Sequence, residues 1–176
     1  MDDLGRRLLA ASYLEGDFVL RSGRRSRFYL DKYLFSTQPE LLRDIAAALA
    51  AKLPAHEPFD LLAGPELGAV AVVTALSLAS GKPFVIVRKQ AKGYGTGKAL
   101  EGRAEPGQRV VLVEDVVTSG GAALAAAGRL VEAGLEVAAL LCVVDREEGG
   151  RAAVEGRGLV FDPLFTATSL GIGKAE

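Results

Sequence analysis

The sequence predicts one α/β domain, spanning residues 1–176, in which helices flank a mainly parallel, twisted sheet. Two observations lead to this fold class. Apolar strand-like runs alternate with helix-like stretches, which is the pattern of consecutive βαβ units. A length of 176 residues, 49% of them hydrophobic, is also enough to bury one core.

Residues 1–38 are expected to form a small helix-and-hairpin element in front of this core. A helix is predicted over residues 4–14. The segments 18–22 (FVLRS) and 27–33 (RFYLDKY) then flank the turn-like residues 23–25 (GRR), which predicts a β-hairpin. The two arginines of that turn are interpreted as a solvated face.

A helix is expected to begin the core at Pro39, because proline is favoured in the first turn of a helix and Leu41, Ile45 and Leu49 follow on one face. The remaining elements are predicted, in chain order, as a strand at 59–64, a helix at 67–80, strands at 84–87 and 109–115, a helix at 121–133, and strands at 135–145 and 158–165.

Residues 88–106 (RKQAKGYGTGKALEGRAEP) interrupt this alternation. The segment is polar, basic and rich in glycine, and it is much longer than an ordinary connection between a strand and a helix. Long glycine-rich loops of compact domains are often lids over a binding site. We therefore expect a mobile catalytic loop here, with a plain disordered loop as the alternative.

The composition excludes several classes of function. A net charge of -1 gives no general attraction to nucleic acid or to an anionic membrane. With Cys142 as the only cysteine and His56 as the only histidine, neither an intrachain disulfide nor a structural zinc site is expected. The first residues lack the apolar centre of a signal peptide, and no apolar run approaches the ~20 residues of a membrane span. A cytoplasmic location is expected.

The most informative stretch is VVLVEDVVTSGGAA, residues 110–123. Its apolar start predicts a buried strand, and Glu114 and Asp115 stand near the carboxyl end of that strand, where open parallel sheets bind ligands. Two adjacent carboxylates in such a place repel each other and are costly to desolvate. They therefore predict a partner with hydroxyl or cationic groups.

The next four residues, Thr118, Ser119, Gly120 and Gly121, open a predicted helix. Glycines let the backbone approach a ligand closely, and the free amides and dipole of a helix N-terminus attract an anion. An acidic pair followed by such a turn can hold a ribose 5-phosphate by its hydroxyls and its phosphate. The alternative is an ordinary strand with solvated acids, followed by an N-capped helix.

This stretch resembles the phosphoribosyl pyrophosphate (PRPP) signature of type I phosphoribosyltransferases. The resemblance implies the type I fold, with Glu114 and Asp115 on the ribose hydroxyls and residues 118–122, ending at Ala122, on the 5-phosphate. It also implies that Asp115 stabilises positive charge developing on the ribose. Mg²⁺ would arrive with the pyrophosphate group and be held mainly through PRPP, with no direct protein ligand.

The segment 88–106 resembles the mobile loop of orotate phosphoribosyltransferases, with tyrosine in the place of a histidine found in many bacterial members. By this resemblance Arg88, Lys89, Lys92 and Tyr94 bind PRPP, and Lys92 is the catalytic lysine. In that family the loop reaches into the neighbouring subunit, which implies a homodimer with shared active sites. A lid of this kind would also keep water from the reactive sugar.

Two further segments resemble the same family. FVLRSGRRSRFYLDKYLF, at 18–35, implies that residues 1–38 form a hood over the base, with Arg21 on the base or phosphates and Tyr29 and Leu30 lining the orotate pocket. We use the name hood for residues 1–38 below.

The sequence VVDREEGG places Arg146 after a predicted strand, and the resemblance assigns Arg146 to the orotate carboxylate alongside Thr118. Arginine suits a planar carboxylate, although an arginine after a strand can also be purely structural. The stretch 64–70 (GPELGAV) occupies the pyrophosphate-binding loop. It departs from the family because Glu66, Leu67, Gly68 and Ala69 stand where many bacterial members have Ala-Tyr-Lys-Gly. The backbone amides remain available, but the side-chain contact of that lysine to pyrophosphate is not expected here.

The implied activity is the reversible reaction of PRPP with orotate to give orotidine monophosphate and pyrophosphate, a step of pyrimidine (UMP) biosynthesis. Two alternatives share the acidic pair and the glycine turn. A purine phosphoribosyltransferase gives no reason for Arg146 or the hood segment. A PRPP-sensing regulator that has lost catalysis would need a basic surface or an added domain for nucleic acid.

Overall fold

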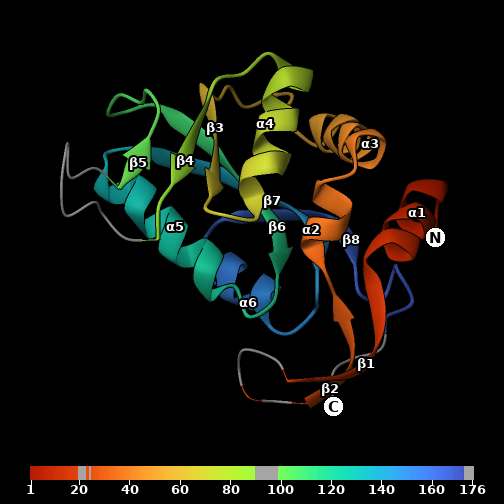
Figure 1. The fold of residues 1–176 in the computed structure, drawn as a ribbon. Coiled ribbons are helices and arrows are strands. Elements are labelled where there is room, and N and C mark those ends of the chain that lie inside the picture. The colour runs from red at the N-terminus through yellow and green to blue at the C-terminus, as the bar shows by residue number, and fades with distance from the viewer. Residues whose placement is uncertain (20–22, 24, 90–98, 173–176) are drawn as a thin grey trace.

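The structure is a computed structural model, and it describes residues 1–19, 23, 25–89 and 99–172 (Figure 1). The elements in chain order are α1 (Asp3–Ser12), β1 (Tyr13–Val19), β2 (Arg25–Leu30), α2 (Lys32–Ser36), α3 (Pro39–Ala50), β3 (Leu61–Pro65), α4 (Ala69–Ser80), β4 (Phe84–Val87), β5 (Leu100–Glu101), β6 (Arg109–Val117), α5 (Gly121–Glu132), β7 (Glu136–Asp145), α6 (Gly150–Glu155) and β8 (Val160–Thr166).

Six strands form the central sheet in the order β5-β4-β3-β6-β7-β8. All neighbours in it are parallel except β4 and β5, which run antiparallel at one edge. The predicted α/β class with a mainly parallel sheet is confirmed. The element boundaries differ from the predicted ones by a few residues, as for β6, which continues through Val117.

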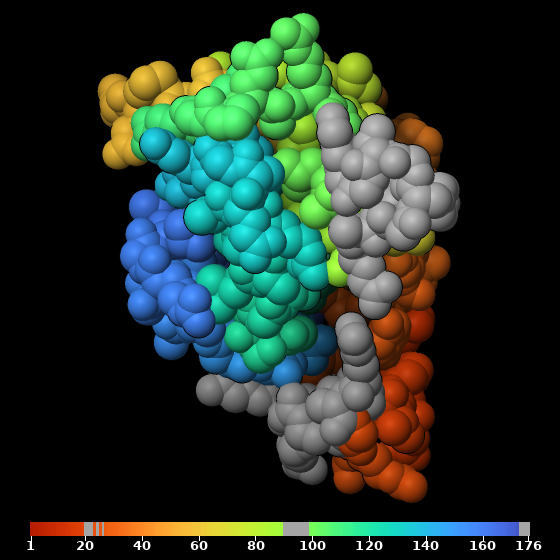
Figure 2. All heavy atoms as spheres, turned by 90° about the vertical axis from the view of Figure 1, so that its left-hand side faces the viewer, coloured from red at the N-terminus to blue at the C-terminus, as the bar shows by residue number. Residues whose placement is uncertain are grey.

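The two faces of the sheet are covered by different helices, and strand residues alternate between them. On β6, Val111 and Val113 belong to the core shared with α3 and α4, whereas Val110 and Leu112 belong to the core shared with α5. This alternation follows from the two-residue repeat of a strand, and burial on both faces explains why the run is continuously apolar. Figure 2 shows α5 covering one side of the molecule.

The hood contains the predicted helix and hairpin, but the helix ends earlier than expected. The prediction of a helix over 4–14 is wrong at its end, because β1 begins at Tyr13 and pairs antiparallel with β2. Tyr13 lies opposite Leu30, and its ring stacks on Phe28 at 5.7 Å between centroids. Cross-strand packing therefore outweighs the helical pattern at this position.

The expected loop at 88–106 is partly ordered secondary structure. Leu100 and Glu101 form β5 and pair with β4, and the Arg88 amide donates to the Ala99 carbonyl at 2.9 Å. A short ladder thus joins the two ends of the segment. Residues 90–98 lie outside the described residues, so mobility of the segment stays a prediction.

The strand order locates the place where a ligand can bind. From β3 the chain continues to β4 on one side, and later returns as β6 on the other side of β3. A crevice opens at the carboxyl ends of two such strands, because their following connections diverge to opposite sides. In Figure 1 the hairpin and α2 lie beyond that end of β6, so the hood faces the crevice.

Candidate active site

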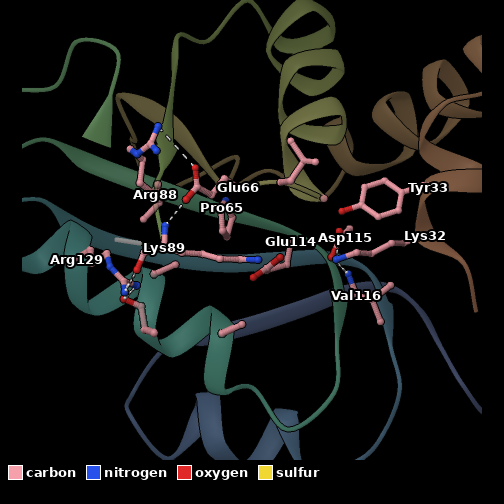
Figure 3. Close-up of a pocket in the computed structure, with 16 residues that line it drawn as sticks. Lys32, Tyr33, Pro65, Glu66, Arg88, Lys89, Glu114, Asp115, Val116 and Arg129 are labelled. Atoms are coloured by element: carbon pink, nitrogen blue, oxygen red, sulfur yellow. Dashed lines mark hydrogen bonds and ion pairs between the residues drawn. The ribbon is translucent and has the colours of Figure 1, made fainter. Parts of the chain in front are cut away.

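A cavity of about 510 Å³ lies at the carboxyl ends of β3 and β6 (Figure 3). Its walls come from the hood, the β3–α4 turn, the end of β4, the end of β6 and one face of α5. The lining residues are Lys32, Tyr33, Pro65, Glu66, Leu67, Gly68, Val87, Arg88, Lys89, Glu114, Asp115, Val116, Ala122, Ala125, Ala126 and Arg129.

The acidic pair lies at the bottom of this cavity and is almost completely buried. Glu114 is 7% exposed and Asp115 is 1% exposed. The Val116 amide donates to Asp115 Oδ1 at 2.6 Å, and Lys32 Nζ lies 2.8 Å from Asp115 Oδ2. This contact is an ion pair without hydrogen-bond alignment, since Oδ2 accepts no hydrogen bond from the described residues. The carboxylate is thus fixed by its own strand and by the hood.

Glu114 is held in an environment that favours its protonated form. Burial raises the pKa of Glu114 to about 8, and the neighbouring charge of Asp115 adds to this effect. Lys32 and Lys89 act in the opposite direction. In Figure 3 the Lys89 side chain extends along the cavity toward Glu114. A ligand that donates hydroxyl hydrogen bonds to Glu114 would favour its ionised form.

The turn after β6 leaves a helix N-terminus open to the outside. Gly120 has φ 82°, a left-handed conformation that favours glycine, and α5 begins without a side-chain cap. Thr118, Ser119 and Gly121 are exposed. Behind the turn, Gly150 of α6 packs so closely that an added Cβ would lie 2.5 Å from the Thr118 carbonyl oxygen. The backing by α6 holds the turn in the open form that suits an anion.

The base of the 88–106 segment is tied to the turn after β3. The Lys89 amide donates to Glu66 Oε1 at 2.7 Å, and Arg88 Nη1 lies 3.8 Å from Glu66 Oε2. Arg129 of α5 donates to the Lys89 carbonyl at 2.6 Å. The peptide bond between Glu66 and Leu67 is cis. Glu66, which departs from the family pattern, therefore contacts the Lys89 amide and the Arg88 guanidinium rather than standing free in the cavity.

Part of the predicted PRPP set is brought together, since Arg88, Lys89, Glu114, Asp115 and Ala122 all line the cavity. The turn residues 118–121 continue from the same strand. Three predicted residues, Arg21, Lys92 and Tyr94, lie outside the described residues.

Of the predicted orotate residues, those that the structure describes are not among the residues that line the cavity. Arg146 is 7% exposed, lies over the Phe28 ring at 4.9 Å and pairs with Glu148 at 3.1 Å. The Leu30 side chain is buried in the core, and Tyr29 is 40% exposed on the hairpin. Stacking of Arg146 on Phe28 joins the hood to the end of β7.

Several lining residues were not predicted as site residues from the sequence, among them Lys32, Arg129 and Gly68. Lys32 lies within the segment 27–33 that was predicted as a strand, but it is the first residue of the short helix α2, which turns it toward Asp115. Arg129 lies within the helix predicted over 121–133 and was not singled out. Gly68 has a detectable signal, since a glycine within a turn at a sheet edge often marks a close approach, but its partner cannot be named from one sequence.

Comparison with known proteins identifies the class of protein as a phosphoribosyltransferase. Residues 35–156 match the family of the phosphoribosyl transferase domain. The orotate phosphoribosyltransferase of Methanocella arvoryzae is 47% identical over 155 residues, which are 88% of this chain and 87% of that protein. This chain belongs to the orotate phosphoribosyltransferase family.

Solved structures give the same result. Orotate phosphoribosyltransferase of Mycobacterium tuberculosis in complex with PRPP superposes with a TM-score of 0.81 at 30% identity, covering 97% of this chain and 98% of that one. Leishmania donovani UMP synthase gives a TM-score of 0.85 at 31% identity over 96% of this chain, which corresponds to 36% of that longer chain. The type I phosphoribosyltransferase fold is thus confirmed.

Within residues 1–19, 25–89 and 99–172, no three His, Cys, Asp or Glu side chains gather to hold a metal ion. Among the helices in that part of the chain, none is long and apolar enough to cross a bilayer.

Proposed function

We propose that the cavity at the end of β3 and β6 transfers ribose 5-phosphate from PRPP to orotate, giving orotidine monophosphate and pyrophosphate. The observation that carries this proposal is the placement of two buried carboxylates, Glu114 and Asp115, beside an uncapped helix N-terminus at the switch point of the sheet. Sugar hydroxyls and a terminal phosphate need these two groups at adjacent positions.

The protein's contribution to the chemistry is electrostatic. The bond between the anomeric carbon and the pyrophosphate oxygen breaks as a ring nitrogen of the orotate anion forms the new bond, so no strong protein base is needed. Positive charge gathers on the ribose, and Asp115 and Glu114 stabilise it from the sugar side. Arg88 and Lys89, which follow β4 and line the same cavity, attract the departing pyrophosphate. We assign catalysis at the leaving group to Lys92, and PRPP contact to Tyr94.

Mg²⁺ fits this cavity as an ion carried by the substrate. Mg²⁺ usually keeps several waters and binds phosphate oxygens, so it needs no closed protein cage, and the described residues provide none. When bound, it neutralises charge on the leaving pyrophosphate.

The orotate base is assigned to the hood side of the cavity. Arg146 offers a planar partner for the orotate carboxylate, with Thr118, Tyr29, Leu30 and Arg21 as further contacts. Support comes from the position of Arg146, which follows β7 directly and whose amide donates to the Val117 carbonyl at 2.8 Å, beside the phosphate turn.

A homodimer with shared active sites and a cytoplasmic location complete the proposal. The hairpin carries exposed apolar side chains in register, since Leu14 at 38% and Tyr29 at 40% exposure are cross-strand partners. Such surfaces often mark contacts between subunits. Analytical ultracentrifugation of the whole chain tests the dimer, and a monomer at micromolar concentration contradicts it.

The function is tested by release of pyrophosphate from PRPP with orotate, uracil, adenine or hypoxanthine as acceptor, with and without Mg²⁺. We expect release with orotate and Mg²⁺ and little with the other bases. Preference for a purine would refute the orotate assignment, and PRPP binding without turnover would indicate a regulator.

Two substitutions test the residue assignments. Lys92→Ala should lower kcat by at least about 100-fold with an unchanged fold, because it removes charge stabilisation at the leaving group. Arg146→Ala should mainly raise KM for orotate, since a charge-assisted contact to the carboxylate is lost. Steady-state kinetics separate the two effects, and an unchanged kcat in Lys92→Ala would exclude its catalytic role.

A further inference from the structure

Lys32 connects the hood to the acid assigned to catalysis. It is the first residue of α2, and its Nζ lies 2.8 Å from Asp115 Oδ2 at the bottom of the cavity (Figure 3). The Asp115 side chain is 2% exposed, whereas the Lys32 side chain is 34% exposed. A buried carboxylate next to a second carboxylate needs a nearby cation to remain charged at moderate cost. Among the described residues, Lys32 supplies that cation for Asp115.

The turn after β3 is shaped to admit this ion pair. A Cβ added to Gly68 would overlap Asp115 Oδ2 and would lie 2.6 Å from Lys32 Nζ. Glycine at this position therefore lets the two groups meet. The hood, the β3–α4 turn and β6 thus meet at the Lys32–Asp115 ion pair, which is part of the cavity wall and not an isolated surface pair.

Positively charged side chains approach the acidic pair, Glu114 and Asp115, from two sides. Lys32 approaches from the hood, and Lys89 extends toward Glu114 from the base of the 88–106 segment (Figure 3). Burial by itself would lower the pKa of Lys32, but the contact and charge of Asp115 outweigh burial and raise it. Lys32 thus stays protonated. Two further titratable groups interact with this cluster, since Tyr33 acts on Lys32, and Glu114 and Asp115 act on Cys142, which Asp145 also affects.

We propose that Lys32 is a positioning residue for the transfer reaction, whose ammonium group holds the Asp115 carboxylate in the orientation that faces the ribose. The hood would then serve the sugar half of the site as well as the base. This inference rests on the proposed role of Asp115 in stabilising charge on the ribose.

The alternative is that the ion pair only fastens α2 to the sheet. The chain offers a matched control for this alternative in Lys52, whose Nζ lies 2.6 Å from Asp162 Oδ1 away from the cavity. Lys52 and Asp162 side chains are 29% and 44% exposed, so this pair also joins distant segments through one lysine. If the Lys32 pair is purely structural, removing either lysine should have the same kind of effect, namely a loss of stability without a change in the kinetics.

The test compares Lys32→Met, Lys32→Arg and Lys52→Met by steady-state kinetics across pH and by thermal unfolding. In Lys32→Met we expect kcat/KM for PRPP to fall about tenfold, mainly through kcat. The acid limb of kcat/KM should move up by about one pH unit, because the charge of Lys32 lowers the pKa of Glu114. Lys32→Arg should restore most of kcat/KM and most of the wild-type pH profile. Lys52→Met should retain the wild-type values of both quantities.

A lower melting temperature with an unmoved pH profile and normal kcat in Lys32→Met would overturn the proposal in favour of a structural tie. A raised KM for PRPP with unchanged kcat would also overturn it, because Lys32 would then be a direct substrate contact. Lys32→Gln provides a second neutral variant where Lys32→Met does not fold. Asp115→Asn distinguishes failure of the proposed function from failure of this inference. If Asp115→Asn keeps normal turnover, the proposed role of Asp115 is wrong. If Asp115→Asn loses turnover while Lys32→Met keeps it, only the role of Lys32 is wrong.

Discussion

The two walls of the cavity are built in different ways. One wall is a single stretch of chain, residues 110–123, in which strand, acids and phosphate-type turn follow one another. The other wall is assembled from α2, the β3–α4 turn and the end of β4, which contribute Lys32, Gly68, Glu66 and Arg88. Only the first wall has the appearance of a motif.

The walls also differ in how their polar groups are satisfied. The contiguous wall has a helix start without a side-chain cap, and burial raises the pKa of its Glu114 to about 8. On the assembled wall, Glu66 already accepts the Lys89 amide and faces Arg88, and Lys32 is already paired. We infer that the contiguous wall, residues 110–123, binds the ligand, whereas the assembled wall positions the groups of the contiguous wall.

The largest effect is expected where the assembled wall touches the acids. Gly68→Ala places a Cβ on Asp115 Oδ2 and should displace the carboxylate, lowering kcat/KM for PRPP by about 100-fold, the cost of a displacement of about 1 Å in a catalytic group. Steady-state kinetics measure this. Gly128→Ala is the control, because a Cβ there meets nothing and alanine should stabilise α5 by about 0.5–1 kcal/mol. Normal kinetics in Gly68→Ala would mean that the two walls are independent.

An intermediate effect is expected on the contiguous wall, at Glu114. Because the pKa of Glu114 in the folded protein is raised to about 8, its contribution to stability is present below its ordinary pKa of 4.5 and is lost as the pH rises toward 8. Glu114→Gln should remove this loss, so without ligand it should exceed the wild type at pH 8 by on the order of a few kcal/mol.

Urea unfolding at pH 5 and pH 8 measures the difference, with Glu136→Gln as a control at an exposed carboxyl group. The same variant should bind PRPP more weakly, since an ionised acid for the ribose hydroxyls is lost. Equal pH dependence in wild type and Glu114→Gln would show that another group causes it.

The smallest effect is expected at Glu66, which joins the β3–α4 turn to the base of the 88–106 segment. Glu66→Gln keeps an acceptor for the Lys89 amide but loses the ion pair with Arg88, so KM for PRPP should rise only about two- to threefold. Glu66→Ala loses both contacts and should raise it about tenfold. Glu57→Gln, which breaks the distant pair with Arg109, should leave KM unchanged. Identical values for Gln and Ala would show that the amide contact contributes nothing.

Much of the fold could be predicted because its elements are long and periodic. The strand at β6 and helix α5 were located to within two residues, since continuous burial and a closing glycine are local signals. Helices α2 and α6 were missed, because five or six residues are too few to establish a helical repeat. The end of α1 was misplaced because Tyr13 pairs with Leu30 of the partner strand β2, a contact that the helical pattern does not show.

The sequence by itself determined the chemistry of one wall, because adjacent acids and a glycine turn act through neighbours in the chain. Tertiary structure alone decided which cation faces Asp115 and what Glu66 contacts. The distances between Lys32 and Asp115, and between Glu66 and Lys89, depend on how three segments cross at a sheet edge. Since ion pairs act over a few ångströms and these partners are 83 and 23 positions apart, no local pattern could have encoded them.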